Sequence, residues 1–241
     1  MTEVMPGDAA GAETLEIMSA APRYNAWQFE QIKPYVGRRV LEVGSGIGNM
    51  SAHIVAAGRD VVVLTDTDAW YQAQLRQRFA DRPEVQVGSL TLPDPAATGR
   101  FRPLALDTVI ALNVVEHIED DVGTLRSMAE LLAPAGRVVV LVPALPSIFG
   151  SLDEELGHFR RYTRASLAAA FQAAGLALER MFWFNRAGTL GWWFNACVRR
   201  TRLIPLAQLR SFDRMVPVLR AERFLPLPFG QSLIAIGRRD G

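Results

Sequence analysis

The chain has 241 residues, about half of them hydrophobic, which is enough to bury one sizeable core with a small appended element. Its formal net charge of +1 excludes a global field that would favour nucleic acid or an anionic membrane, so any basic site must be local. The single cysteine, Cys197, excludes an internal disulfide, and three scattered histidines without CxxC or HExxH spacing argue against a structural zinc site. No metal is predicted.

The N-terminal stretch MTEVMPGDAAGAETLE is acidic and lacks a continuous apolar run. We therefore interpret residues 1–16 as a loose leader rather than an export signal, and we expect a cytoplasmic protein. The following stretch, APRYNAWQFEQIKPYV from Ala21 to Val36, has the pattern of an amphipathic helix.

Strand and helix patterns then alternate along the chain. RVLEV at 39–43 is a short apolar run that predicts a buried strand, a helix is expected from Asn49 to Ala57 with Gly58 ending it, and VVVLT at 61–65 predicts a second strand. The remaining expected elements are a helix over 69–80, a strand at 85–87, a strand at 106–112, a helix over 121–133 and a strand at 137–142. This alternation predicts an α/β fold with a mainly parallel sheet covered by helices.

The pattern changes after Pro143. PALPSIFGSLDEELGHFRRYT is turn-rich and too irregular for a core crossover, so we expect a loop over the site. Thr163 then caps a helix that Gly175 ends, and LALERMFWF at 176–184 predicts a strand. SLIAIG at 232–237 follows a Pro/Gly turn and is expected to insert antiparallel.

Residues 185–227 are expected to form a cap or insertion within a single domain that spans 1–241. The region MFWFNRAGTLGWWFNACVRRTRLIPLAQLRSF is rich in Trp and Phe, with arginines near its end, and has too few consecutive apolar residues for a membrane span of about 20. It could form an apolar ligand pocket, make peripheral membrane contact with its basic residues at the headgroups, or be a homodimer surface. We favour the pocket.

Three glycines and an acidic residue mark the first βαβ unit, VLEVGSGIGNMSAHIVAAGRDVVVLTDTD at 40–68. Gly44, Gly46 and Gly48 carry no side chain that would keep a ligand from the backbone amides of the turn. Asp66 ends the second strand, where it could accept two hydrogen bonds from a ribose diol, so an adenosine-containing ligand fits both features. The spacing is GxGxG rather than GxGxxG, which disfavours a nicotinamide cofactor.

These residues resemble the first motif of the class I S-adenosylmethionine-dependent methyltransferases. LDTVIALNVVEHIEDD at 106–121 and LLAPAGRVVVLVPA at 131–144 resemble the fourth and fifth strands of that family. The resemblance covers roughly residues 24–184 and the terminal strand. It implies a Rossmann-like seven-stranded, mostly parallel sheet with helices on both faces and an antiparallel last strand. It also implies methyl transfer from S-adenosyl-L-methionine to a small-molecule acceptor, with S-adenosyl-L-homocysteine as product.

The resemblance also implies a donor site. Glu42 and Gly44 would lie near the methionine amino group and Asp66 at the ribose, although Glu42 could be a buried carboxylate satisfied by backbone amides and Asp66 could cap the next helix. Many relatives have an acidic residue after the third strand, where this chain has VGSLT, so Ser89 and Leu90 are expected beside adenine. The residues predicted to bind the donor are Tyr24, Glu42, Gly44, Ser45, Gly46, Gly48, Asp66, Thr67, Ser89, Leu90, Asn113 and Val114.

Methyl transfer requires a base only when the acceptor must lose a proton. His117, which follows the fourth strand, and His158, in LGHFRRYT, are the candidate catalytic bases, and a hydrogen bond to a neighbouring loop is the alternative role for His117.

The residues predicted to bind the acceptor are Trp27, Arg160, Arg161 and Tyr162. The arginines suit phosphate or carboxylate, although they could equally form a solvated charge pair. Trp27 could instead pack on the core.

Two other classes of function stay open at this point. A non-catalytic module that binds the donor or its product would share the same motifs, because methyl transfer has no obligatory catalytic triad. An NAD-dependent oxidoreductase should show GxGxxG and a Tyr/Lys or Cys constellation, which the sequence lacks. Near-neutral charge, and NVVE where an NPPY-like stretch would stand, disfavour a nucleic-acid acceptor. We expect the acceptor to be hydrophobic, anionic or both.

Overall fold

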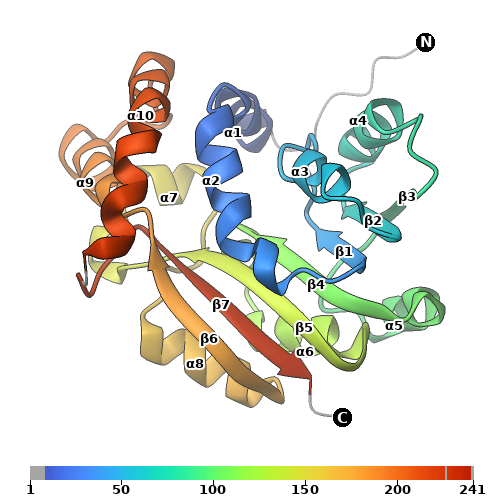
Figure 1. The fold of residues 1–241 in the computed structure, drawn as a ribbon. Coiled ribbons are helices and arrows are strands. Elements are labelled where there is room, and N and C mark those ends of the chain that lie inside the picture. The colour runs from blue at the N-terminus through green and yellow to red at the C-terminus, as the bar shows by residue number, and fades with distance from the viewer. Residues whose placement is uncertain (1–8, 226, 240–241) are drawn as a thin grey trace.

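The sheet has the strand order β3-β2-β1-β4-β5-β7-β6 in the computed structural model, which describes residues 9–225 and 227–239 (Figure 1). The strands are β1 (Arg39–Val43), β2 (Val61–Asp66), β3 (Val85–Ser89), β4 (Leu106–Leu112), β5 (Leu132–Pro143), β6 (Leu176–Phe184) and β7 (Ser232–Arg239). The neighbours from β3 to β5 pair in parallel, whereas β7 is antiparallel to both β5 and β6. The predicted Rossmann-like sheet with an antiparallel last strand is confirmed.

Helices cover both faces of this sheet (Figure 1). The α-helices are α1 (Ala9–Ser19), α2 (Pro22–Ile32), α3 (Ser51–Ala56), α4 (Ala69–Arg78), α5 (Pro95–Phe101), α6 (Asp121–Glu130), α7 (Ser151–Glu155), α8 (Arg164–Ala173), α9 (Arg186–Trp193) and α10 (Leu206–Leu219). A π-helical segment, η5 (Phe194–Arg199), extends α9, and the 3-10 turns are η1 (Lys33–Tyr35), η2 (Arg102–Leu104), η3 (Val115–His117), η4 (Pro146–Ile148) and η6 (Arg220–Phe224).

The strands are apolar on both sides because each face of the sheet carries its own core. Successive residues of a strand point to opposite faces, so Val138 and Val140 of β5 pack with α6 and α8, while Val139 lies in the other core with α2, α3 and α10. Figure 1 shows α6 and α8 below the sheet, with α2 and α10 above it. Two-sided burial explains why these strands read as continuous apolar runs.

Several predicted boundaries differ from the observed ones. The helix expected to run to Ala133 ends at Glu130, because Pro134 disfavours helical backbone at Ala133, and β5 already begins at Leu132 with a register irregularity opposite β4. The helix expected at 49–57 is the shorter α3, and α4 ends at Arg78 rather than Ala80. α5 was not predicted from the sequence.

The predicted loose leader is wrong for residues 9–16, which belong to α1, whereas residues 1–8 lie outside the described part. The segment after Pro143, expected to be a loop, includes η4 and the short helix α7. The predicted insertion at 185–227 contains α9, η5, α10 and η6. Within residues 9–225 and 227–239, none of the helices combines the length and apolar character needed to span a bilayer.

The turn from β1 to α3 requires backbone that glycine adopts without strain. Gly44 has a φ of 66°, and a Cβ atom there would lie 2.6 Å from a methyl group of Val114, the residue that follows β4 by two positions. Gly58, which ends α3 with a φ of 72°, has open space where its Cβ would be. The first glycine is therefore constrained by both backbone and packing, and the second by backbone alone.

This contrast predicts different costs for two alanine substitutions. Gly58→Ala should lower the free energy of unfolding by about 1 to 2 kcal/mol, the cost of left-handed backbone for a residue with a side chain. Gly44→Ala should lose a further 1 kcal/mol or so, because β-branched Val114 must move or be compressed. Urea denaturation of both variants measures the difference. Equal losses in the free energy of unfolding would show that Val114 can move aside without cost.

Candidate functional site

A cavity of about 680 Å³ opens at the carboxyl ends of the central parallel strands. Gly44, Gly46 and Asp66 line one end, and Trp192 and Phe212 line the other. A second cavity of about 290 Å³ adjoins the first, since both are lined by Gly44, Asp66, Thr67, Val114 and His117. Ligands of open α/β sheets bind at this edge.

Asp66 links the glycine turn to the end of β2. One of its carboxylate oxygens accepts a hydrogen bond from the amide of Gly46 (2.9 Å), and the other accepts from the amide of Asp68 (3.1 Å). Burial raises the pKa of Asp66, and these amide donors oppose that rise. The cap of α4 is Asp68, whose carboxylate accepts from the amide of Trp70 (2.7 Å), so the alternative role of Asp66 as helix cap is wrong.

Eight of the residues predicted to bind the donor line one or both cavities: Tyr24, Gly44, Gly46, Asp66, Thr67, Leu90, Asn113 and Val114. Leu90 lies in the smaller cavity beside Thr91 and Leu92. Asn113 directly follows β4 and has a φ of 55°, which turns the chain across the cavity wall.

The other predicted donor residues, Glu42, Ser45, Gly48 and Ser89, do not line either cavity. The buried Glu42 carboxylate accepts a hydrogen bond from the Ser51 hydroxyl at the start of α3, and burial raises its pKa to about 7. Gly48 faces Leu75 and Phe79 in the core, and the Ser89 carbonyl accepts from Arg100. Glu42 is thus a buried carboxylate, as in its alternative role, but its partner is a hydroxyl rather than the backbone amides expected.

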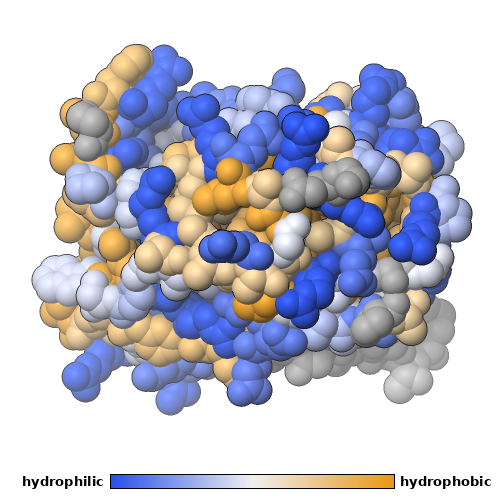
Figure 2. Space-filling view, turned by 90° about the horizontal axis from the view of Figure 1, so that it is seen from below, coloured by the Kyte–Doolittle hydropathy of each residue, from blue (hydrophilic) through white to orange (hydrophobic). Residues whose placement is uncertain are grey.

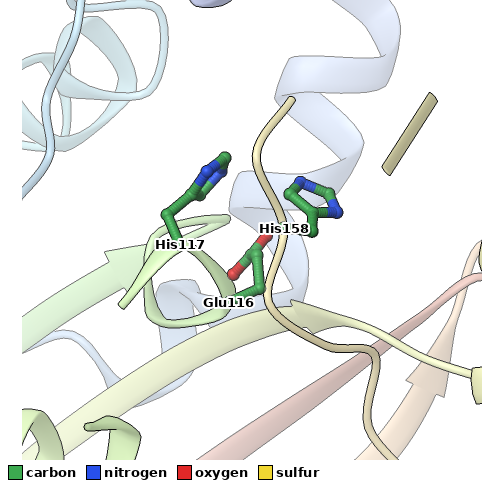
Figure 3. A group of neighbouring side chains, drawn as sticks. All are labelled: Glu116, His117 and His158. Atoms are coloured by element: carbon green, nitrogen blue, oxygen red, sulfur yellow. The ribbon is translucent and has the colours of Figure 1, made fainter. Parts of the chain in front are cut away.

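Glu116, His117 and His158 gather in the wall of the main cavity (Figure 3). The two imidazole rings are nearly perpendicular, with their centroids 4.7 Å apart. Glu116 is fully buried, neither of its carboxylate oxygens accepts a hydrogen bond from another described residue, and burial raises its pKa to about 8. The two histidines, which were proposed separately as bases, therefore line the same cavity beside the Glu116 carboxylate.

Asp153 of α7 connects the walls of this end of the cavity. Its buried carboxylate accepts hydrogen bonds from Nδ1 of His158 (2.9 Å), Nε of Arg161 (2.8 Å) and Nε1 of Trp192 (3.1 Å). Burial opposes its ionisation, but the bonds and charges of His158 and Arg161 together hold the pKa of Asp153 below its usual value. An ionised carboxylate can only accept, so Nδ1 of His158 is the donor and Nε2 faces away from Asp153.

The residues predicted to bind the acceptor divide into two groups. Arg161 lines the cavity, although its guanidinium also donates to the Ala144 carbonyl (2.6 Å) and lies 4.7 Å from the Trp192 ring centroid. Arg160 and Tyr162 do not line it, because both bind Asp121, at 3.0 Å and 2.9 Å. Trp27 is 3% exposed and packs against Phe184 in the core, as its alternative role required.

The helices of residues 185–227 contribute one face to the cavity and expose the other. Gly188, Trp192, Asn195, Leu209 and Phe212 line the cavity. Exposed hydrophobic side chains of the same segment include Leu190, Trp193, Phe194, Val198, Met215 and Val218. Figure 2 shows hydrophobic residues along the side of the molecule on which Figure 1 draws α9 and α10.

A family model described as a methyltransferase domain matches residues 18–180. The chain belongs to the methyltransferase-domain family. Its fold is that of the class I S-adenosylmethionine-dependent methyltransferases.

Relatives with known names agree with this assignment. The methyltransferase is 30% identical over 108 residues to a ubiquinone biosynthesis O-methyltransferase of Paracidovorax citrulli, a match that covers 44% of each chain. It is 27% identical over 168 residues to a tRNA U34 carboxymethyltransferase of Pseudomonas syringae pv. tomato, covering 67% of this chain and 49% of the relative. The matches thus span less than half the length of these two relatives.

A solved structure shares the fold across most of the methyltransferase. Geranyl diphosphate C-methyltransferase from Streptomyces coelicolor, solved with S-adenosyl-L-homocysteine bound, gives a TM-score of 0.64 at 13% identity, covering 89% of this chain and 78% of that one.

Sequence reasoning missed two parts of this methyltransferase's site. The first is α1, whose Leu15 lies over Gly46 and whose Thr14 and Met18 line the main cavity, and the Asn49 side chain fixes α1 by donating to the Leu15 carbonyl (3.0 Å). The spacing of Leu15 and Met18 was the available signal. The second is Glu116, whose signal was a carboxylate four residues after the end of a buried strand.

The raised pKa of Glu42 predicts a pH-dependent stability. Between about pH 4.5 and pH 7 the folded methyltransferase keeps a proton on Glu42 that the unfolded chain releases. Stability should therefore fall as pH rises through this window, by up to about 3 kcal/mol for this one group. Glu42→Gln removes the titration, so the variant should gain stability relative to the wild type as pH rises.

Urea denaturation of both proteins from pH 4.5 to pH 8 measures this difference. Glu154→Gln makes the same change at an exposed position on α7 and should leave the pH dependence almost unaltered. A wild-type profile parallel to that of Glu42→Gln would contradict the assignment.

Proposed function

We propose that this methyltransferase transfers a methyl group from S-adenosyl-L-methionine to a small, largely hydrophobic acceptor that carries a hydroxyl or an anionic group. The observation that carries the proposal is one cavity that runs from the Gly44 turn and Asp66 to an aromatic end at Trp192 and Phe212. Its volume of about 680 Å³ lies in the range typical of small-molecule sites.

The donor fits the glycine-rich end. Asp66 is placed to bind the ribose hydroxyls, exchanging its present amide contacts for charged hydrogen bonds to the diol. The adjoining smaller cavity, with Leu90 and Leu92 in its wall, offers an apolar slot for adenine. Val114 lines both cavities and Asn113 lines the main one, where the methionyl part and its sulfonium would face the acceptor.

Methyl transfer is an in-line displacement: the acceptor atom forms a bond to the methyl carbon while the bond from carbon to sulfur breaks, leaving the neutral thioether. Holding the two reactants in line supplies several kcal/mol of the barrier reduction. Excluding water strengthens the electrostatic interactions within the site. α1 and α7 contribute to the walls of the cavity and would exclude water from the reacting atoms.

The acceptor end favours an amphiphilic molecule. Trp192, Ile204, Leu209 and Phe212 supply an apolar wall, whereas Arg161 and the histidines supply polar groups in one patch. The relative named as a ubiquinone biosynthesis O-methyltransferase favours transfer to oxygen, for which His117 or His158 is placed to accept the hydroxyl proton. The near-neutral charge favours a small molecule over the tRNA in the other relative's name.

The competing class is a module that binds the donor without using it. The inner face of α9 and α10 supports the cap interpretation of residues 185–227, and the peripheral-membrane and homodimer interpretations of their outer face stay predictions. A cytoplasmic location likewise stays a prediction.

Calorimetry with S-adenosyl-L-methionine and S-adenosyl-L-homocysteine tests donor binding, and labelled-methyl transfer tests turnover. The acceptor panel contains prenylated phenols and catechols, aromatic carboxylates, and unmodified tRNA. We expect micromolar donor binding and label transfer to a phenol or catechol. Transfer only to tRNA would overturn the small-molecule proposal, and donor binding with no transfer to any acceptor would favour the module.

Asp66→Ala should weaken S-adenosyl-L-homocysteine binding by about 1 to 3 kcal/mol through loss of charged hydrogen bonds to the ribose. Asp60→Ala is the matched control, because it removes the same charge at the exposed residue just before β2. Calorimetry on the three proteins gives the dissociation constants. Equal affinity of Asp66→Ala and the wild type would remove Asp66 from the donor site.

A further inference from the structure

We propose that Glu116, His117 and His158 form a binding site for a divalent transition-metal ion in the wall of the main cavity. The sequence predicted no metal, because spacing motifs such as HExxH detect only ligands that lie close together in the chain. Here Glu116 and His117 come from η3 after β4, and His158 comes from the segment after α7 (Figure 3). The proposal goes beyond methyl transfer and does not depend on it.

The three side chains are held close together. One ligand atom from each residue lies within 4.8 Å of those of the other two. The two segments are fixed to each other by a main-chain hydrogen bond from the amide of Phe159 to the carbonyl of Glu116 (2.8 Å). The amide of His158 is in turn bound to the carbonyl of Asp153 (2.9 Å). The ligand positions are therefore built on anchored backbone.

The Glu116 carboxylate is the observation that points to a cation. The side chain is fully buried, and neither oxygen accepts a hydrogen bond from another described residue. Buried carboxylates are normally paired, hydrogen-bonded or bound to metal ions, because an isolated one is costly. A metal ion bound by the carboxylate and the two imidazoles would neutralise the charge of this buried carboxylate.

His158 has the orientation typical of a metal ligand. Its Nδ1 donates to the Asp153 carboxylate, which fixes the tautomer and leaves Nε2 as the lone-pair nitrogen. Metal-bound histidines almost always donate their other ring N–H to a carboxylate or carbonyl in this way. Asp153 is itself held by Arg161 and Trp192, so the ring cannot turn freely.

The charges around the cluster favour a cation. Arg161 is the guanidinium that acts on Glu116, and its charge is offset by its ion pair with Asp153 (2.8 Å). The Glu116 carboxylate then has no positively charged side chain hydrogen-bonded to it among the described residues. A divalent ion would bring its own charge to this position without displacing Arg161.

The ligand types select the metal. Two imidazoles and one carboxylate suit Zn²⁺, Mn²⁺, Fe²⁺ or Co²⁺, whereas Mg²⁺ and Ca²⁺ prefer oxygen ligands alone. Three protein ligands also leave at least one coordination position open, as in catalytic zinc sites. The cluster lines the cavity, so that position would face a water molecule or an oxygen of the bound acceptor.

The test uses the full chain stripped of metal with a chelator and titrated calorimetrically with Zn²⁺, and separately with Mg²⁺. We expect one Zn²⁺ per chain with a micromolar or lower dissociation constant, and Mg²⁺ binding at least about 100-fold weaker. His117→Gln and His158→Gln should each weaken Zn²⁺ binding by 10-fold or more. His53→Gln is the matched control, because His53 is the remaining histidine of the sequence and stacks on Phe29, away from the cluster.

Absence of Zn²⁺ binding to the wild type would overturn the proposal, as would equal weakening in His53→Gln. Glu116→Gln keeps the size of the side chain, so it provides a second variant if a histidine substitution prevents folding, and it too should weaken binding at least 10-fold. Asp66→Ala should bind Zn²⁺ like the wild type while losing donor affinity. Failure of the metal site and failure of the donor site would therefore be seen in different titrations.

Discussion

The acceptor side of the cavity depends on one buried carboxylate. Asp153 accepts hydrogen bonds from His158, Arg161 and Trp192, which belong to two segments separated in the chain by β6 and α8. Removing it would leave a buried guanidinium and an indole N–H without their partner, a loss that typically costs several kcal/mol. One side chain thus holds α9 against α7 and also sets the orientation of the His158 ring.

The two ends of the cavity are built by different means. At the donor end Gly44, Asp66 and Asn113 lie at the carboxyl ends of parallel strands. The backbone pairing of these strands sets the distances between the three residues, whatever the neighbouring side chains are. At the other end Trp192 and Phe212 come from helices inserted between β6 and β7, whose inner faces form the wall. Under the proposed function, the residues at the sheet edge bind the donor, and residues 185–227 determine which acceptor the cavity can bind.

The sheet could be predicted from the sequence because each of its signals is local: apolar runs, a glycine turn and an acidic strand end. The partners of individual side chains could not be predicted, because they depend on which distant helix or strand packs against each residue. Trp27 and Tyr24 share one helix face and both contact Phe184, yet only Tyr24 also lines the cavity. Glu42 is the penultimate residue of β1 and Asp66 the last residue of β2, but the Glu42 carboxylate binds Ser51 in the core whereas Asp66 lines the cavity.

The cluster around Glu116 was not predicted from the sequence, because it too depends on a contact between distant segments. In the sequence His117 and His158 are forty-one positions apart and were interpreted as alternative bases. The fold places the centroids of their rings 4.7 Å apart and brings the Glu116 carboxylate close to both. A hydroxyl acceptor bound there would meet both histidines at once. Whether the cluster holds a proton or a metal ion, its chemistry therefore belongs to the three side chains jointly and not to either histidine alone.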